Sequence, residues 1–231
     1  MHGIHISILG YRKTLFFPGF AMMVAVLSIF TGCASDGKFK SARVMEPSPA
    51  STAHSFERLA DGREGFIIME TPQMDEESRR DFDRAVAMLN NEEYDQAMVL
   101  LENVIEKSPG VTAPYINMAI ACRHTGKLEQ AEEHLKTALQ FVPDHPAASN
   151  EYGLLYRKTG RLAEAREIYE KAITRAPDYY PVHRNLGILC DLYLNDLTCA
   201  LEHYEIYSEA MPDDRQVTLW IADLHGRLEQ N

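Results

Sequence analysis

Apolar and small side chains recur along the second half of the chain at the three- and four-residue spacings of amphipathic helices. The same positions also recur at a longer interval of 34 residues. Four sets of residues keep this interval: Pro109, Pro143 and Pro177; Ala97, Ala131 and Ala165; Leu101, Leu135 and Tyr169; and Val104, Ala138 and Ala172. So many positions in one register predict tandem copies of a single helical unit.

Each unit is expected to contain two antiparallel helices, A and B. The A helices are predicted near 76–90, 112–124, 146–158 and 180–192, and the B helices near 95–107, 128–141, 162–175 and 197–210. Gly126 and Gly160 supply a left-handed residue after two A helices, and the repeated prolines end the B helices. The fold class is therefore all-α, with about four units in 75–213 and a polar-ended capping helix in 214–231.

Two further features belong to this register. One small residue occurs in each A helix, namely Ala85, Ala119, Gly153 and Gly187. We expect these small residues to let the two helices of a unit approach closely. Pro212 follows Pro177 by 35 residues, so the fourth unit carries one residue more than the others.

This combination of interval, paired helices and small residues resembles the tetratricopeptide repeat family over about 78–212. The resemblance implies a solenoid whose A helices line a groove for extended or helical peptide segments. The side chains that helical spacing points toward this groove are Asn117, Ile120 and Arg123; Asn150, Leu154, Arg157 and Lys158; and Arg184, Asn185 and Ile188.

Asparagines and arginines are the strongest candidates for ligand contact in this groove. Asn117 and Asn185 match the asparagine that bonds the ligand backbone in peptide-clamping members of the family, and an amide both donates and accepts. Arg123, Arg157 and Arg184 offer forked donors to carboxylates, which favours an acidic partner segment. The alternative is that these residues are ordinary solvated helix ends. The carboxylate clamp of chaperone-binding members is not matched residue for residue.

The N-terminal segment 1–32 has the layout of a secretory signal. It contains Arg12 and Lys13, no acidic residue, and an apolar run that ends at Thr31-Gly32-Cys33. This ending resembles the bacterial lipobox, which implies cleavage before Cys33 and attachment of lipid to that cysteine. By the same resemblance, an alanine after the cysteine favours the outer membrane, facing the periplasm. The alternative is an ordinary signal peptide with a chance cysteine.

Residues 34–64 are rich in Ser, Ala, Pro and Gly, and 33–74 are predicted to be a flexible tether. Within them, Phe66–Met69 is a short apolar segment. Three interpretations are open for it: a short strand, a segment that docks a partner, or a strap packed on the first helices. The strap is the preferred interpretation.

Composition narrows the range of functions. The 231 residues include 23 Lys and Arg against 34 Asp and Glu, a net charge of −11, which argues against nucleic acid as a partner. The chain shows no nucleophile elbow, no phosphate loop and no zinc-binding helix motif, so no enzyme activity, cofactor, metal or small-molecule substrate is predicted. Helical ligand spacing of three or four residues is not found among five histidines of the repeat region and capping helix: His124, His134, His183, His203 and His225.

Cys190 and Cys199 flank the A–B turn that carries the extra residue of the fourth unit. A disulfide between them is permitted in an exported protein, and small buried packing residues are the alternative. Cys122 has no obvious partner.

The predicted function is that of a non-enzymatic, lipid-anchored scaffold that binds other proteins of the bacterial envelope. The amino-acid sequence of the fourth unit resembles that of small tetratricopeptide proteins that accompany TonB- and ExbB-type energy transducers. The overall plan also resembles outer-membrane lipoproteins that pilot pilus secretins. An adaptor of cell-wall enzymes is a further alternative.

Overall fold

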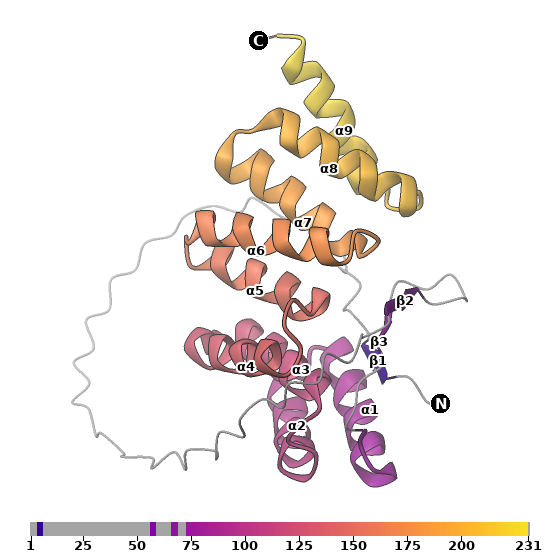
Figure 1. The fold of residues 1–231 in the computed structure, drawn as a ribbon. Helices are drawn as coiled ribbons and strands as arrows, with labels where there is room; N and C mark the ends of the chain where they lie inside the picture. Colours follow the sequence, from indigo (N-terminus) through magenta and orange to yellow (C-terminus); the bar gives the residue numbers. More distant parts are fainter. Residues whose placement is uncertain (1–3, 7–55, 59–65, 69–72, 231) are drawn as a thin grey trace, which may run out of the picture. The chain divides into compact units, whose positions relative to one another are not determined.

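The computed structural model describes residues 4–6, 56–58, 66–68 and 73–230 (Figure 1). The helices in this part are α1 (Glu76–Asn90), α2 (Tyr94–Lys107), α3 (Thr112–His124), α4 (Leu128–Phe141), α5 (Pro146–Lys158), α6 (Leu162–Arg175), α7 (Tyr180–Leu189), α8 (Leu197–Ala210) and α9 (Arg215–Leu228), with a π-helical turn, η1 (Cys190–Leu194), after α7. The predicted all-α repeat fold of about four units and a capping helix is confirmed. No helix in the described part of the chain is long and apolar enough to cross a membrane.

Three short strands precede the helices. They are β1 (Ile4–Ile6), β2 (Phe56–Arg58) and β3 (Phe66–Ile68), and they form an antiparallel sheet in the order β1-β3-β2. Ile68 of β3 stands opposite Ile4 of β1 on one side and Phe56 of β2 on the other. Of the three interpretations of Phe66–Met69, the structure therefore has the short strand. The predicted lipid-attachment residue, Cys33, and most of the predicted signal peptide and tether lie outside the described residues.

The helices pack by a nearest-neighbour rule. The A and B helices of each unit contact one another, each B helix contacts the next A helix, and α9 packs on α8. The A helices of adjacent units also touch, α1 with α3, α3 with α5 and α5 with α7. The alanines that open the B helices are completely buried: Ala97, Ala131, Ala165 and Ala200. This arrangement makes each unit depend on its neighbours for burial of its apolar surface.

Two glycines show why the small position of helix A is small. A Cβ added at Gly153 would overlap the ring of Tyr169, and one added at Gly187 would overlap the ring of Tyr204. Both tyrosines belong to the B helix of the same unit and are at most 1% exposed. Aromatic bulk on helix B is thus accommodated by the missing side chain on helix A.

The turns between A and B helices follow the predicted pattern in the second and third units. Gly126 has φ 81° and Gly160 has φ 78°, both in the left-handed region that glycine enters without strain. In the fourth unit the equivalent residue is Asn195, with φ 53°. Asparagine is among the few side-chain-bearing residues that enter this region routinely.

The fourth A helix differs from its expected form. The sequence predicts that it runs to 192, but α7 ends at Leu189 and the chain continues as η1. In the second unit the closing bond of the turn runs from Lys127 N to Cys122 O, five residues back, and in the fourth it runs from Asp196 N to Cys190 O, six back. The extra residue is therefore accommodated as a π-helical turn, which leaves the start of α8 in its usual place.

Candidate interaction surface

The predicted groove residues lie on α3, α5 and α7, and their polar members link successive A helices. Asn185 Nδ2 donates to Asn150 Oδ1 at 2.8 Å, so the fourth unit bonds to the third. Lys158 Nζ donates to the backbone oxygen of Arg123 at 3.0 Å, so the third unit bonds to the second. Arg157 Nη1 lies 3.4 Å from the backbone oxygen of Asn185. The inner side of the A helices therefore carries a series of hydrogen bonds between units.

The two asparagines singled out for ligand contact are buried. Asn117 is 1% exposed and its Nδ2 donates to Ala113 O on its own helix at 3.0 Å. Asn185 is 8% exposed and its Nδ2 is engaged by Asn150. A partner peptide would have to replace these bonds or use the remaining hydrogen-bonding groups of the two amides.

Two of the three predicted arginines already have carboxylate partners. Arg123 Nη2 lies 3.0 Å from Glu151 Oε2, and the two side chains are 19% and 7% exposed. Arg184 Nε lies 3.5 Å from Asp214 Oδ2, and its guanidinium stands 5.2 Å from the ring centroid of Trp220. Both arginines therefore hold helices together: Arg123 joins α3 to α5, and Arg184 joins α7 to the residue that caps α9.

Arg157 and Lys158 differ from these two. Neither has a carboxylate partner among the described residues, and Lys158 is exposed at the end of α5. The predicted apolar floor is reduced to Leu154 and Ile188, which are partly exposed, because Ile120 is 4% exposed and belongs to the core. The remaining accessible inner surface thus combines apolar side chains with two uncompensated positive charges.

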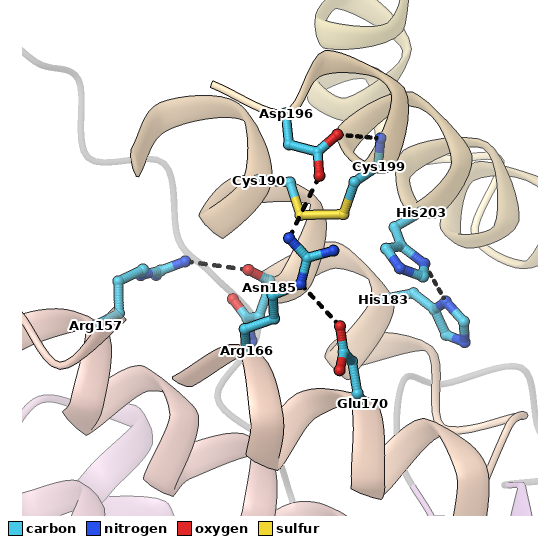
Figure 2. The surroundings of a disulfide bond; sticks show 9 residues. All are labelled: Arg157, Arg166, Glu170, His183, Asn185, Cys190, Asp196, Cys199 and His203. Carbon is cyan, nitrogen blue, oxygen red and sulfur yellow. Dashed lines mark hydrogen bonds and ion pairs between the residues drawn. A yellow bond between two sulfur atoms is a disulfide. The ribbon is translucent and has the colours of Figure 1, made fainter. Parts of the chain in front are cut away.

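A disulfide joins η1 to α8 (Figure 2). It links Cys190 and Cys199, whose Cα atoms are 5.9 Å apart. Beside it, Asp196 accepts from Cys199 N at 3.1 Å and pairs with Arg166 at 3.3 Å. The two sulfurs and the Asp196 carboxylate lie within 4.8 Å of one another, but the disulfide consumes the thiolates that a metal ion would need. Cys122 is free and buried.

Two histidines that are not paired by helical spacing in the sequence lie in contact in the structure. His183 Nδ1 of α7 lies 3.1 Å from His203 Nδ1 of α8 (Figure 2). His183 Nε2 lies 3.2 Å from Pro177 O. A carbonyl can only accept, so His183 must carry its proton on Nε2 when neutral. His183 Nδ1 is then the acceptor, and His203 Nδ1 donates to it. His183 also lines an open depression of about 490 Å³, together with Pro177, Asp178, Tyr180, Ile206 and Glu209.

With this geometry in place, comparison with known proteins identifies the repeats. A family model described as tetratricopeptide repeat matches residues 110–178. Tetratricopeptide repeats therefore account for residues 110–178. Such arrays are protein–protein interaction scaffolds, so the partners of this chain are proteins. No curated protein matches the chain at a significant level.

Several solved structures resemble this tetratricopeptide chain. PilF of Pseudomonas aeruginosa is 23% identical with a TM-score of 0.62, over 68% of this chain and 71% of that one. PilW, described as a widely conserved type IV pilus biogenesis factor, is 21% identical with a TM-score of 0.60, over 68% and 72%. MamA of Desulfovibrio magneticus is 18% identical with a TM-score of 0.55, over 68% and 88%. At such identities the likeness concerns the fold.

Tetratricopeptide geometry explains why sequence spacing missed some of these contacts. Arg123 and Glu151 are 28 residues apart, and Asn150 and Asn185 are 35 apart. The second separation is one residue more than the 34-residue repeat and the first is six residues less, and both pairs join adjacent A helices. A search for complementary polar residues 28–35 positions apart would have found both pairs. His183 and His203 are 20 apart and meet within one unit, across its A and B helices.

The disulfide leads to a direct prediction. Protein recovered from an oxidising compartment should yield a linked peptide pair containing Cys190 and Cys199, lighter by the two hydrogens lost on oxidation. Non-reducing peptide mass spectrometry measures this, and Cys122 provides the internal control because it should be recovered as a free thiol. Complete alkylation of all three cysteines without reductant would contradict the prediction.

The histidine pair predicts a pH dependence of stability. Burial, and then the charge of His203, lower the pKa of His183, and burial also lowers the pKa of His203 against the opposing charges of Glu202 and Glu170. Below the unfolded pKa of about 6.5 the unfolded chain binds more protons than the folded one. The free energy of unfolding should therefore fall as pH drops from about 7 toward 5.

Urea titrations across this pH range measure the effect in the wild type and in a His183→Gln/His203→Gln variant. The absolute stability of the variant is not the readout. Its pH slope should be shallower than that of the wild type, and an identical slope would show that the pair does not contribute.

Proposed function

We propose that this tetratricopeptide protein is a lipid-anchored scaffold of the bacterial envelope that holds a partner protein during assembly of a type IV pilus apparatus. The proposal rests on three features that occur together in one chain. A lipobox-like ending at Cys33 precedes a Ser-, Ala-, Pro- and Gly-rich tether, and the tether leads into a repeat array whose structural neighbours include a type IV pilus biogenesis factor.

The neighbours favour pilus assembly over the TonB/ExbB role expected from the fourth unit. PilF and PilW both match over 68% of this chain, and none of the three neighbours named above is described as part of a TonB or ExbB system. Because identities of 21–23% support only the fold, the proposal rests on the fold together with the proposed anchor.

The inner face of α5 and α7 is the proposed partner surface. Leu154 and Ile188 provide partly exposed apolar contact area, and Lys158 provides a charge without a described carboxylate partner. Contacts of this size give modest affinity. An anchor that holds the scaffold and its partner at one membrane would raise their effective concentration and make modest affinity sufficient.

The anchor is tested by replacing Cys33 with Ser and labelling growing cells with radioactive palmitate. The wild type should incorporate label and fractionate with the outer membrane, and the variant should lose both, because attachment of acyl chains needs the cysteine. A Cys122→Ser variant controls for loss of an unrelated thiol. Equal label in the wild type and the Cys33→Ser variant would overturn the anchor.

The role in pilus assembly is tested separately in a strain that lacks the protein. We expect less assembled secretin oligomer in the outer membrane at an unchanged amount of secretin monomer, with recovery when the wild-type gene is restored. Normal secretin assembly in the deletion strain would exclude the pilus role and leave the anchor and the repeat scaffold in place.

A further inference from the structure

The π-helical turn of the fourth unit exposes two adjacent apolar side chains. Leu192 is 69% exposed and Tyr193 is 48% exposed. Single exposed apolar residues are ordinary on protein surfaces, but adjacent large ones are characteristic of interaction sites. Among the described residues, the other large apolar side chains with comparable exposure are Val99, Phe141 and Leu219, and none of these neighbours another in sequence.

Three contacts hold this turn in one conformation. The Cys190–Cys199 disulfide joins it to α8, and Asp196 N donates to Cys190 O at 2.9 Å. Asp191, whose side chain is 8% exposed, pairs with Arg227 of the capping helix at 2.7 Å. A rigid turn loses little conformational entropy on binding, so its exposed side chains are preorganised for a partner. The turn exists because of the extra residue of the fourth unit, and π-helical insertions occur often at functional sites.

A positive charge lies beside one of these side chains, Tyr193. The guanidinium of Arg157 stands 5.7 Å from the ring centroid of Tyr193, and Arg157 Nη1 donates to a backbone carbonyl, that of Asn185 (Figure 2). No carboxylate in the described part of the chain pairs with Arg157, whereas the acid of the turn, Asp191, is neutralised by Arg227. In a chain of net charge −11, an uncompensated arginine next to exposed apolar groups is complementary to a carboxylate on a partner.

We propose that Leu192, Tyr193 and Arg157 form a docking site, which we call the bridged-turn surface, for a peptide segment that presents an apolar side chain next to a carboxylate. The apolar side chain packs on Leu192 and Tyr193, and the carboxylate pairs with Arg157. This surface adjoins the inner face of α5 and α7, but the inference does not rest on the pilus role or on the lipid anchor.

The test uses the purified full-length chain and three fluorescent peptides that differ only in the residues flanking one phenylalanine: glutamate, glutamine or lysine. Fluorescence anisotropy should show the glutamate peptide bound at least about tenfold more tightly than the other two. Leu192→Ala/Tyr193→Ala should weaken its binding about tenfold, which corresponds to about 1.4 kcal/mol. Arg157→Gln should abolish the preference for glutamate over glutamine.

Two matched variants control for loss of surface groups elsewhere. Leu219 is 65% exposed on α9, and Arg175 is exposed at the end of α6, so Leu219→Ala and Arg175→Gln should bind the glutamate peptide as the wild type does. Thermal melts confirm that every variant is folded. Equal binding of all three peptides, or unchanged binding by Leu192→Ala/Tyr193→Ala, would overturn the proposal. Self-association of the wild type that the same double variant abolishes would also overturn it, because the occupant would then be a second copy of the chain.

Discussion

Replacing Gly153 by alanine is expected to lower the free energy of unfolding by about 1–3 kcal/mol. The new methyl group would overlap the ring of Tyr169, which is completely buried. The ring or the helix must therefore shift, and the cost exceeds the gain in helix propensity that alanine brings. Urea and thermal unfolding of the purified variant measure the loss.

Gly226 provides the matched control, because it also lies inside a helix but a Cβ added there would meet no other atom within 4 Å. Gly226→Ala should leave stability unchanged or raise it by up to about 1 kcal/mol through helix propensity alone. A loss of stability in Gly153→Ala together with a gain in Gly226→Ala would support the tight contact between the A and B helices. Equal melting temperatures for both variants and the wild type would show that Gly153 and Tyr169 are not in the tight contact described for the third unit.

Replacing Arg123 by methionine should destabilise the protein by about 3–5 kcal/mol. The substitution leaves the carboxylate of Glu151, which is 7% exposed, without its cationic partner at the contact between α3 and α5. An unpaired buried charge is far more costly than the absence of both partners. Adding Glu151→Gln to the Arg123→Met variant should therefore restore much of the lost stability.

The exposed pair of Lys171 and Glu167 on α6 is the control. Their side chains are 63% and 65% exposed, and such pairs contribute little to stability. Lys171→Met should leave the urea midpoint unchanged. If Arg123→Met behaved in the same way, the link between α3 and α5 would not be structural. The result also decides how binding is tested, because charge reversal at Arg123 would disturb folding before it disturbed a partner.

Much of the repeat fold could be predicted from the 34-residue interval alone. The interval assigns the small residue of helix A, the alanine that opens helix B and the proline that follows it, and these together determine where each helix begins and ends. The helix α1 has the predicted bounds, and the B helices begin within one residue of the predicted positions. Period and composition suffice here because each unit buries its apolar face only against its neighbours.

The fourth unit could be predicted less completely. An interval of 35 residues reveals one extra residue, but an extra residue can lengthen a loop or widen a helix into a π turn. The backbone hydrogen bond to Cys190 O distinguishes a π turn from a longer loop. That bond depends on the three-dimensional contacts of η1 with α8. Sequence spacing places both cysteines at the turn without specifying the backbone that joins them.

The groove could be predicted only in outline. Helical spacing identifies which side of α3, α5 and α7 faces inward, but it cannot say which polar side chains are already satisfied by a neighbouring unit. Asn185 and Arg123 are candidates for ligand contact on helical spacing, and in the structure both bond to the third unit. Arg157 is a candidate with them, and it is the arginine of the three without a described carboxylate partner.

The most direct test of the central claim is site-specific photocrosslinking in the native envelope, with a photoreactive residue at position 154 or at position 163. Leu154 lies on the inner face of α5, and Ala163 is exposed on the B helix α6 of the same unit. We predict that position 154 crosslinks a component of the pilus assembly apparatus and that position 163 does not. Crosslinking of that component from position 163 alone, or from neither position, would contradict the proposed role.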